Sequence, residues 1–102
     1  MTGLSDFVPW TSEPERQWHF RKHGLSLRTP TVEAYDASAR GTIRAGRRFT
    51  YRQWVSGQAR VGYYDPATQR LTILNARETR VVSHFRCPES YVRGQDESNY
   101  QR

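Results

Sequence analysis

In the stretch Ile43-Arg44-Ala45-Gly46-Arg47-Arg48-Phe49-Thr50-Tyr51, the spacing of apolar residues changes from that of a helix to that of a strand. Before it, apolar residues recur three or four positions apart, as they do along one helix face: Val32, Tyr35, Ala39 and Ile43. After it, alternate residues share a strand-like pattern from Phe49 to Val55. Gly46 lies at the change, so we expect the helix to end there.

The rest of the second half predicts three further strands. They span Arg60 to Asp65, Leu71 to Leu74 and Arg80 to Arg86. Asp65-Pro66-Ala67-Thr68 is typical of a type I turn, with proline at its second position. Short turns of this kind favour antiparallel neighbours.

Two helices are predicted in the first half. Ser12-Glu13-Pro14-Glu15 is typical of a helix start, because its serine can cap the first turn and its second glutamate completes a capping box. This helix is predicted to run to about His23 and to stop at Gly24. Thr29-Pro30-Thr31 predicts the start of the second helix.

These elements predict an α+β fold in which two N-terminal helices pack on an antiparallel sheet of about four strands. At 102 residues the chain is long enough for one domain and too short for two. We therefore expect residues 1–102 to form a single domain, with an irregular arm over 1–11 and a polar tail over 94–102.

The composition points to a polyanionic partner. The net charge is +6, and Lys22 is the only lysine among 16 basic residues. Arginine presents a planar fork that suits phosphate and can stack on bases. The alternative is a solvated basic surface with no partner. A single cysteine, Cys87, excludes an internal disulfide and a multi-cysteine zinc site, and no apolar run is long enough to span a membrane.

A histidine at the end of the first predicted helix is the first candidate for acid–base chemistry. His23 follows Lys22 there, and histidine is the side chain whose pKa is most readily tuned near neutral pH. The alternative is that His23 only contacts the last helical carbonyls. His19 lies four residues earlier, a spacing that could hold a metal, but no HExxH pattern is present and we expect no metal site.

The last predicted strand offers two faces with different chemistry. Alternation places Val81, Ser83 and Phe85 on one face, and Val82, His84 and Arg86 on the other. Ser83 could bond a phosphate oxygen while Phe85 stacks on a base. His84 on the opposite face is the competing acid–base residue, and alternation alone does not choose between them.

Arginine and aromatic residues are interleaved throughout the predicted sheet. The arginines extend from the end of the second helix into every strand: Arg44, Arg47, Arg48, Arg52, Arg60, Arg70, Arg77, Arg80, Arg86 and Arg93. The interleaved aromatic residues are Tyr51, Trp54, Tyr63 and Tyr64. This mixture suits single-stranded nucleic acid, although some of the rings must form the core.

Three short motifs resemble the nuclease domain of colicin D and related C-terminal domains of contact-dependent bacterial toxins, within the group of small ribonucleases that includes barnase. Phe20-Arg21-Lys22-His23-Gly24 is similar to the family's helix with its Lys-His pair. Tyr64-Asp65-Pro66-Ala67-Thr68 resembles its hairpin turn, and Val82-Ser83-His84-Phe85 its last strand. The turn before that strand lacks the family's usual glycine.

The resemblance implies a metal-independent endoribonuclease without a cofactor, often one that cuts tRNA in the anticodon arm. His23, Lys22 and Ser83 would then be catalytic, and Phe85 would hold a base. We expect further RNA contacts from Arg52, Arg80, Arg86 and Tyr91. The domain would be a monomer that acts in the cytoplasm of a target bacterium, delivered as the end of a larger toxin and blocked by an acidic immunity protein.

Two other functions fit the same residues. One is a non-catalytic module that binds RNA or DNA through a basic aromatic sheet. The other is a ribonuclease toxin of a toxin–antitoxin pair that acts on ribosome-bound message. Cleavage of tRNA in the presence of EDTA separates the enzymes from the binding module.

Overall fold

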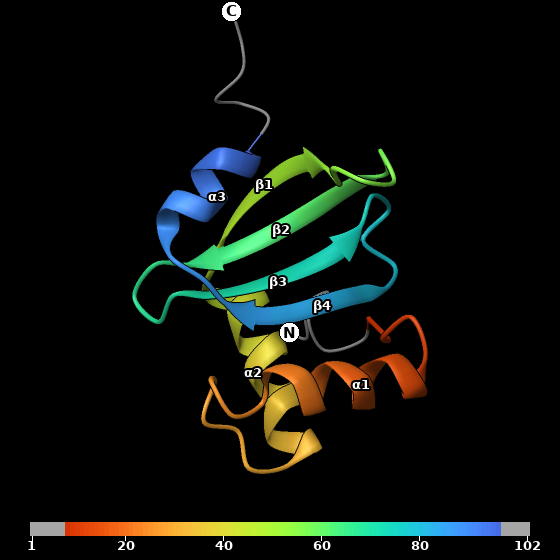
Figure 1. Cartoon of the computed structure of the whole chain (residues 1–102), viewed down its shortest axis with the longest axis vertical. Helices are drawn as coiled ribbons and strands as arrows, with labels where there is room; N and C mark the ends of the chain where they lie inside the picture. The colour runs from red at the N-terminus through yellow and green to blue at the C-terminus, as the bar shows by residue number, and fades with distance from the viewer. Residues whose placement is uncertain (1–7, 97–102) are drawn as a thin grey trace, which may run out of the picture.

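The computed structural model describes residues 8–96, which form two helices, a four-stranded antiparallel sheet and a third helix. Figure 1 shows the sheet between helices that lie on different sides of it. The predicted α+β class, with two helices before the sheet, is confirmed. No helix within these residues is both long and apolar enough to cross a membrane.

The first helix begins at its predicted cap, and the second begins directly after the stretch Thr29-Pro30-Thr31 that was predicted to start it. Helix α1 spans Glu13–His23, and the Ser12 hydroxyl accepts a hydrogen bond from the backbone N–H of Glu15. Gly24 follows the helix and packs closely against Phe20. A Cβ at this position would lie 2.8 Å from the Phe20 ring. Helix α2 spans Val32–Ala45 and is capped by Thr31.

The sheet is a simple meander in which each strand pairs with the next along the chain. The strands are β1 (Arg47–Arg52), β2 (Ala59–Asp65), β3 (Arg70–Asn75) and β4 (Val81–Arg86), in the order β1-β2-β3-β4. Strand β1 ends three residues earlier than alternation predicted. The chain turns there instead, with Gly57 at a φ of +71° and its N–H bonded to the Gln53 carbonyl.

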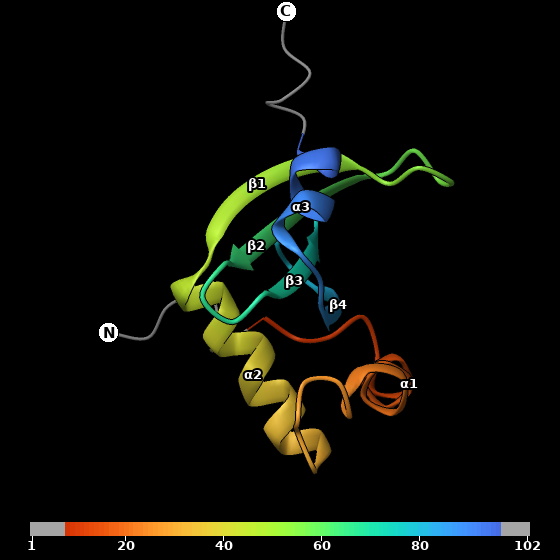
Figure 2. The same cartoon turned by 60° about the vertical axis from the view of Figure 1, so that its left-hand side comes forward.

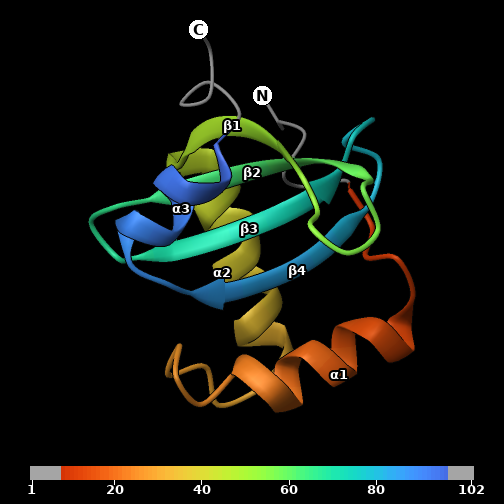
Figure 3. The same cartoon turned by 45° about the horizontal axis from the view of Figure 1, so that its top comes forward.

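Helices cover both faces of the sheet, as Figures 2 and 3 show. On one face, α2 packs through Tyr35, Ala39 and Ile43, as its periodicity predicted, against Leu74 and Val81. On the other face, a second core contains Phe49, Tyr51, Tyr64, Leu71, Ile73, Cys87 and Val92. Tyr51 and Tyr64 are therefore core residues rather than surface rings.

The two ends of the described chain differ from the sequence prediction. Val8 and Trp10, within the expected irregular arm, are buried, and Trp10 forms a parallel bridge with Val81. At the other end, helix α3 spans Glu89–Gln95 and buries Val92, so the first residues of the expected tail are helical. Residues 1–7 and 97–102 of the arm and tail lie outside the described residues.

A bulge in β4 changes the predicted faces of that strand. Ile73 pairs with Ser83 but Leu74 pairs with Val81, so Val82 is an extra residue. As a result, Val81 lies on the α2 face with His84, and Val82 lies with Phe85 on the other face. The predicted grouping of Ser83 with Phe85 is correct, whereas that of Val81 with them is wrong.

Candidate functional site

A cleft of about 560 Å³ lies between α1, the open face of the sheet and α3. Its aromatic lining comes from four separate parts of the chain: Trp18, Tyr51, Trp54, Phe85 and Tyr91. Its polar lining contains Glu15, His19, Gln53, Arg60, Ser83 and Gln95. We call it the main cleft. Its size and mixed lining suit one or two unpaired nucleobases with their phosphates.

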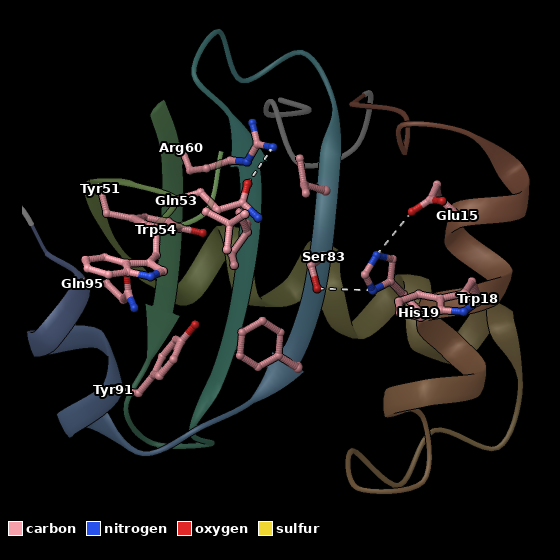
Figure 4. Close-up of a pocket in the computed structure, with 14 residues that line it drawn as sticks. Glu15, Trp18, His19, Tyr51, Gln53, Trp54, Arg60, Ser83, Tyr91 and Gln95 are labelled. Carbon is pink, nitrogen blue, oxygen red and sulfur yellow. Dashed lines mark hydrogen bonds and ion pairs between the residues drawn. The ribbon is translucent and has the colours of Figure 1, made fainter. Parts of the chain in front are cut away.

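At one wall of the main cleft, α1 lies beside β4 and faces Ser83 with a histidine. The Ser83 hydroxyl oxygen is 3.4 Å from Nδ1 of His19, and Nε2 of His19 is 3.6 Å from the Glu15 carboxylate. Figure 4 shows this row of three side chains across the groove. Both contacts are longer than a good hydrogen bond, so the histidine is held loosely and can exchange partners with a ligand.

His23 lies one turn further along the same helix face. Its ring stacks on that of His19 at 5.8 Å between centroids and packs 5.4 Å from the ring of Phe85. The structure thus brings His23 next to Phe85, one of the residues predicted from the last strand, although His23 is not among the residues that line the main cleft. Four-residue spacing places side chains on one helix face, so the sequence contained the signal for the His19–His23 pair. From the sequence alone, this spacing indicated only a metal site, which was not expected.

The surroundings of both helix histidines favour the neutral imidazole. Burial, together with the nearby His19 and Lys22, lowers the pKa of His23 to about 4. Burial also lowers the pKa of His19, with the Glu15 carboxylate acting in the opposite direction. At neutral pH, His23 is therefore unprotonated and ready to accept a proton.

The competing residue, His84, is inaccessible. It has no exposed surface and lies beneath the sheet against Tyr35 of α2. Its Nε2 is 2.8 Å from the Ser38 hydroxyl, and its Nδ1 is 3.0 Å from the Leu71 carbonyl, which can only accept. His84 is a core residue with both ring nitrogens bonded, and no substrate can reach it in this fold.

The other predicted site residues fall into two groups. Phe85 and Tyr91 line the main cleft, and their rings meet edge to face at 5.9 Å. Arg80 lines a neighbouring cleft of about 370 Å³ that shares Glu15, His19 and Arg60 with it. Lys22 lies outside the lining, with its ammonium 4.8 Å from the ring centroid of Trp18, so its charge lies beside the cleft.

Two predicted residues lie away from the main cleft. Arg52 bonds the Gly57 carbonyl in the β1–β2 loop, and Arg86 faces the α2 side of the sheet, where it bonds Gln69. Only Ser83, Phe85 and Tyr91 among the residues that line the main cleft were predicted for the site, and Arg60 and Trp54 are among those that were not. Arg60 reaches the main cleft from β2, and Trp54 stands in the loop that β1 was expected to continue through.

In the part of the chain that the structure describes, the helix histidines lack the further ligands that a metal ion would need. Within residues 8–96, no group of three His, Cys, Asp or Glu side chains is placed to hold one. Glu15 and His19 stand as a pair.

No family model matches the sequence, and no curated protein or solved structure matches the chain. The function is therefore inferred from the residues of the cleft.

Proposed function

We propose that this protein is a metal-independent endoribonuclease. The observation that carries the proposal is the meeting of His19, the Ser83 hydroxyl and the Phe85 ring in the lining of an aromatic cleft, with the ring of His23 beside those of His19 and Phe85. RNA contains its own nucleophile, the 2′-hydroxyl, so an enzyme needs only to move two protons and stabilise charge on the phosphorus. The chain supplies groups for each task.

The base in this mechanism is His23. Its lowered pKa keeps it unprotonated at neutral pH, and a bound phosphate would raise that pKa toward the range in which a histidine takes the proton of the 2′-hydroxyl as that oxygen attacks the adjacent phosphorus. The bond from phosphorus to the 5′-oxygen then breaks. The products are a 2′,3′-cyclic phosphate and a free 5′-hydroxyl.

The acid is His19, which must protonate the leaving 5′-oxygen. Burial lowers the pKa of His19 in the free protein, the Glu15 carboxylate 3.6 Å from its Nε2 acts in the opposite direction, and a bound phosphate would shift the pKa further toward the charged form that the acid step needs. The Ser83 hydroxyl beside its Nδ1 can hold a phosphate oxygen. Lys22 and Arg60 add positive charge near the developing phosphorane.

The decisive experiment is incubation of the purified protein with total tRNA in EDTA, followed by mapping of the product ends. We expect discrete fragments that carry cyclic phosphate and 5′-hydroxyl ends. An RNA with one 2′-deoxynucleotide at the mapped site should resist cleavage, because the nucleophile is missing. Ser83→Ala should slow cleavage, while the matched variant Ser90→Ala, exposed on α3 outside the cleft, should not.

A non-catalytic nucleic-acid-binding module is the second candidate. Trp54, 92% exposed at the rim of the main cleft, favours it, because an exposed ring in a basic protein suits base stacking without any chemistry. Intact RNA with a shift in gel mobility, in the EDTA experiment, would favour this function and contradict the ribonuclease.

The proposal extends to a toxin with a cognate inhibitor. A ribonuclease in the cytoplasm of its producer is harmful, so a protein that blocks it is expected, with an acidic face that complements the net charge of +6. We propose tRNA in a target bacterium as the substrate and an immunity protein or antitoxin as the inhibitor. Growth on expression of the chain alone, compared with its co-expression beside the neighbouring open reading frame, tests this.

A further inference from the structure

A separate cleft, of about 290 Å³, opens beyond the end of α1 and contains three arginines. It is lined by Ser26, Leu27, Arg28, Thr68, Arg70 and Arg86, and we call it the arginine cleft. Figures 1 and 3 show the loop after α1, the β2–β3 turn and the end of β4 on the same side of the molecule. None of its residues lines the main cleft.

The arginine cleft contains a like-charge pair that folding alone does not favour. Arg70 and Arg86 lie directly opposite each other on β3 and β4, where two cations repel. Within the described residues, neither has a carboxylate within ion-pair distance. The nearest acidic residue in register is Asp65, opposite Arg70, and it bonds the Ala67 N–H and the Thr68 hydroxyl instead.

Arg70 is held in place while part of its hydrogen-bonding capacity is left over. Its guanidinium donates to the Ser38 hydroxyl at 2.7 Å and to the Leu27 carbonyl at 2.9 Å. A guanidinium has five N–H donors, so three remain after these bonds. A cation fixed in this way is arranged in advance for an anion.

Arg28 brings a third guanidinium to the cleft from the loop after α1. Its backbone lies in the left-handed region, with a φ of +58°, and so do the backbones of Gln69 and Glu78. The turn places its side chain at the same cleft, one residue after Leu27, whose carbonyl Arg70 binds. The repelling arginine pair of β3 and β4 and the side chain of Arg28 therefore line one cleft.

We propose that the arginine cleft binds a phosphate group, and that in function this is a phosphate of the bound RNA strand other than the one cleaved. The site begins directly after His23, because the Ser26 hydroxyl bonds the His23 carbonyl. This assignment to RNA rests on the proposed function, whereas the affinity for phosphate follows from the three guanidiniums alone.

The first test measures thermal stability in sodium phosphate against sodium chloride of equal ionic strength. The variant is Arg86→Gln, and the matched control is Arg77→Gln in the β3–β4 turn, which removes the same charge outside both clefts. We expect phosphate to raise the Tm of the wild type and of Arg77→Gln by several degrees, and not that of Arg86→Gln. In chloride, Arg86→Gln should be at least as stable as the wild type, because the repulsion is gone.

The second test separates RNA phosphate from free phosphate. A short single-stranded 2′-O-methyl RNA cannot be cleaved by 2′-oxygen attack, so its binding is measured apart from activity. Arg86→Gln should weaken this binding about tenfold, and Arg77→Gln much less. Failure of the wild type to cleave unmodified RNA would contradict the proposed function and leave both of these measurements intact.

Two results would overturn the inference. If Arg86→Gln responds to phosphate as the wild type does, the arginine cleft is not a phosphate site. If it loses the phosphate response but binds the 2′-O-methyl RNA as well as Arg77→Gln does, the site takes free phosphate and its assignment to the RNA strand is wrong.

Discussion

Three histidines in this small protein have lowered pKa values for one shared reason, burial, and yet they differ in what they can do. His84 is enclosed in the core with both ring nitrogens bonded. His19 and His23 stack on one face of α1, beside Ser83 and Phe85. Accessibility, rather than pKa, distinguishes the two candidate catalytic histidines from the structural one.

Replacement of His23 by alanine should stop cleavage and preserve the fold. Loss of an acid–base group slows a reaction by roughly a hundred- to ten-thousand-fold. The rate of tRNA cleavage and the circular dichroism spectrum are to be compared with those of the wild type. Normal cleavage by His23→Ala together with an inactive His19→Ala would transfer the role of base to His19.

The free energy of unfolding should decrease as the pH falls from about 6.5 to about 4. In this window an unfolded histidine takes up a proton, whereas folded His84, with a pKa of about 4, does not. The unfolded state therefore binds more protons and is favoured as acid is added. The loss from His84 is about 3 kcal/mol at the acid end.

Urea unfolding at pH 7 and at pH 4.5 measures this loss. His84→Gln keeps a side chain that can bond its neighbours but cannot titrate, so its stability should depend less on pH than that of the wild type. An equal decrease in both proteins would show that other groups cause the acid sensitivity.

At the scale of elements, sequence reasoning worked where a cap or a strong periodicity existed. Helix α1 begins and ends at the predicted residues, and α2 ends at the predicted Gly46 but begins at Val32, just after its predicted start. The residues that act at these helix ends are Ser12, Thr31, Gly24 and Gly46. Helix α3 was missed, since it has seven residues and its N-cap, Pro88, makes no side-chain hydrogen bond. Strand β1 was predicted too long, because alternation continues through a segment that turns.

The candidate site was predictable in part for the same reason. The side chains of α1 could be placed on one face from their spacing, and Ser83 and Phe85 on one face of β4 from theirs. The bulge at Val82 reversed the face of Val81 and could not be seen in the alternation. Arg60 and Trp54 could not be assigned, since their place in the main cleft depends on how α1 lies against the sheet.

The β1–β2 loop should contribute to RNA binding through Trp54. This side chain is 92% exposed and lines the main cleft, so its removal costs the fold little. Stacking of a base on an aromatic ring is worth about 1–3 kcal/mol, so Trp54→Ala should weaken the binding of single-stranded RNA by roughly five- to a hundredfold.

Trp54→Phe is the matched control, because it keeps an aromatic face. Fluorescence anisotropy with an uncleavable labelled RNA gives both affinities, and the Tm reports on stability. Equal affinities for the alanine variant and the wild type would place the bases elsewhere in the cleft.

For the whole molecule, the net charge of +6 predicts binding that weakens with salt. If RNA phosphates displace counterions, the logarithm of the affinity should fall with that of the salt concentration, with a slope of about −0.7 for each phosphate neutralised on a single strand. Titrations with 2′-O-methyl RNA between low and physiological salt measure the slope. An affinity that does not change with salt would contradict both nucleic-acid functions.

The parallel bridge between Trp10 and Val81 has a consequence for how this sheet meets other chains. In the described residues, the Val81 N–H bonds the Pro9 carbonyl and the Thr11 N–H bonds the Val81 carbonyl, so the start of β4 already has a neighbour on its outer side. The opposite border, β1, carries arginines at Arg47, Arg48 and Arg52, and charge on an outer strand discourages a second copy from pairing with it. A peptide that extends this sheet by strand addition should therefore join at β1 rather than at β4.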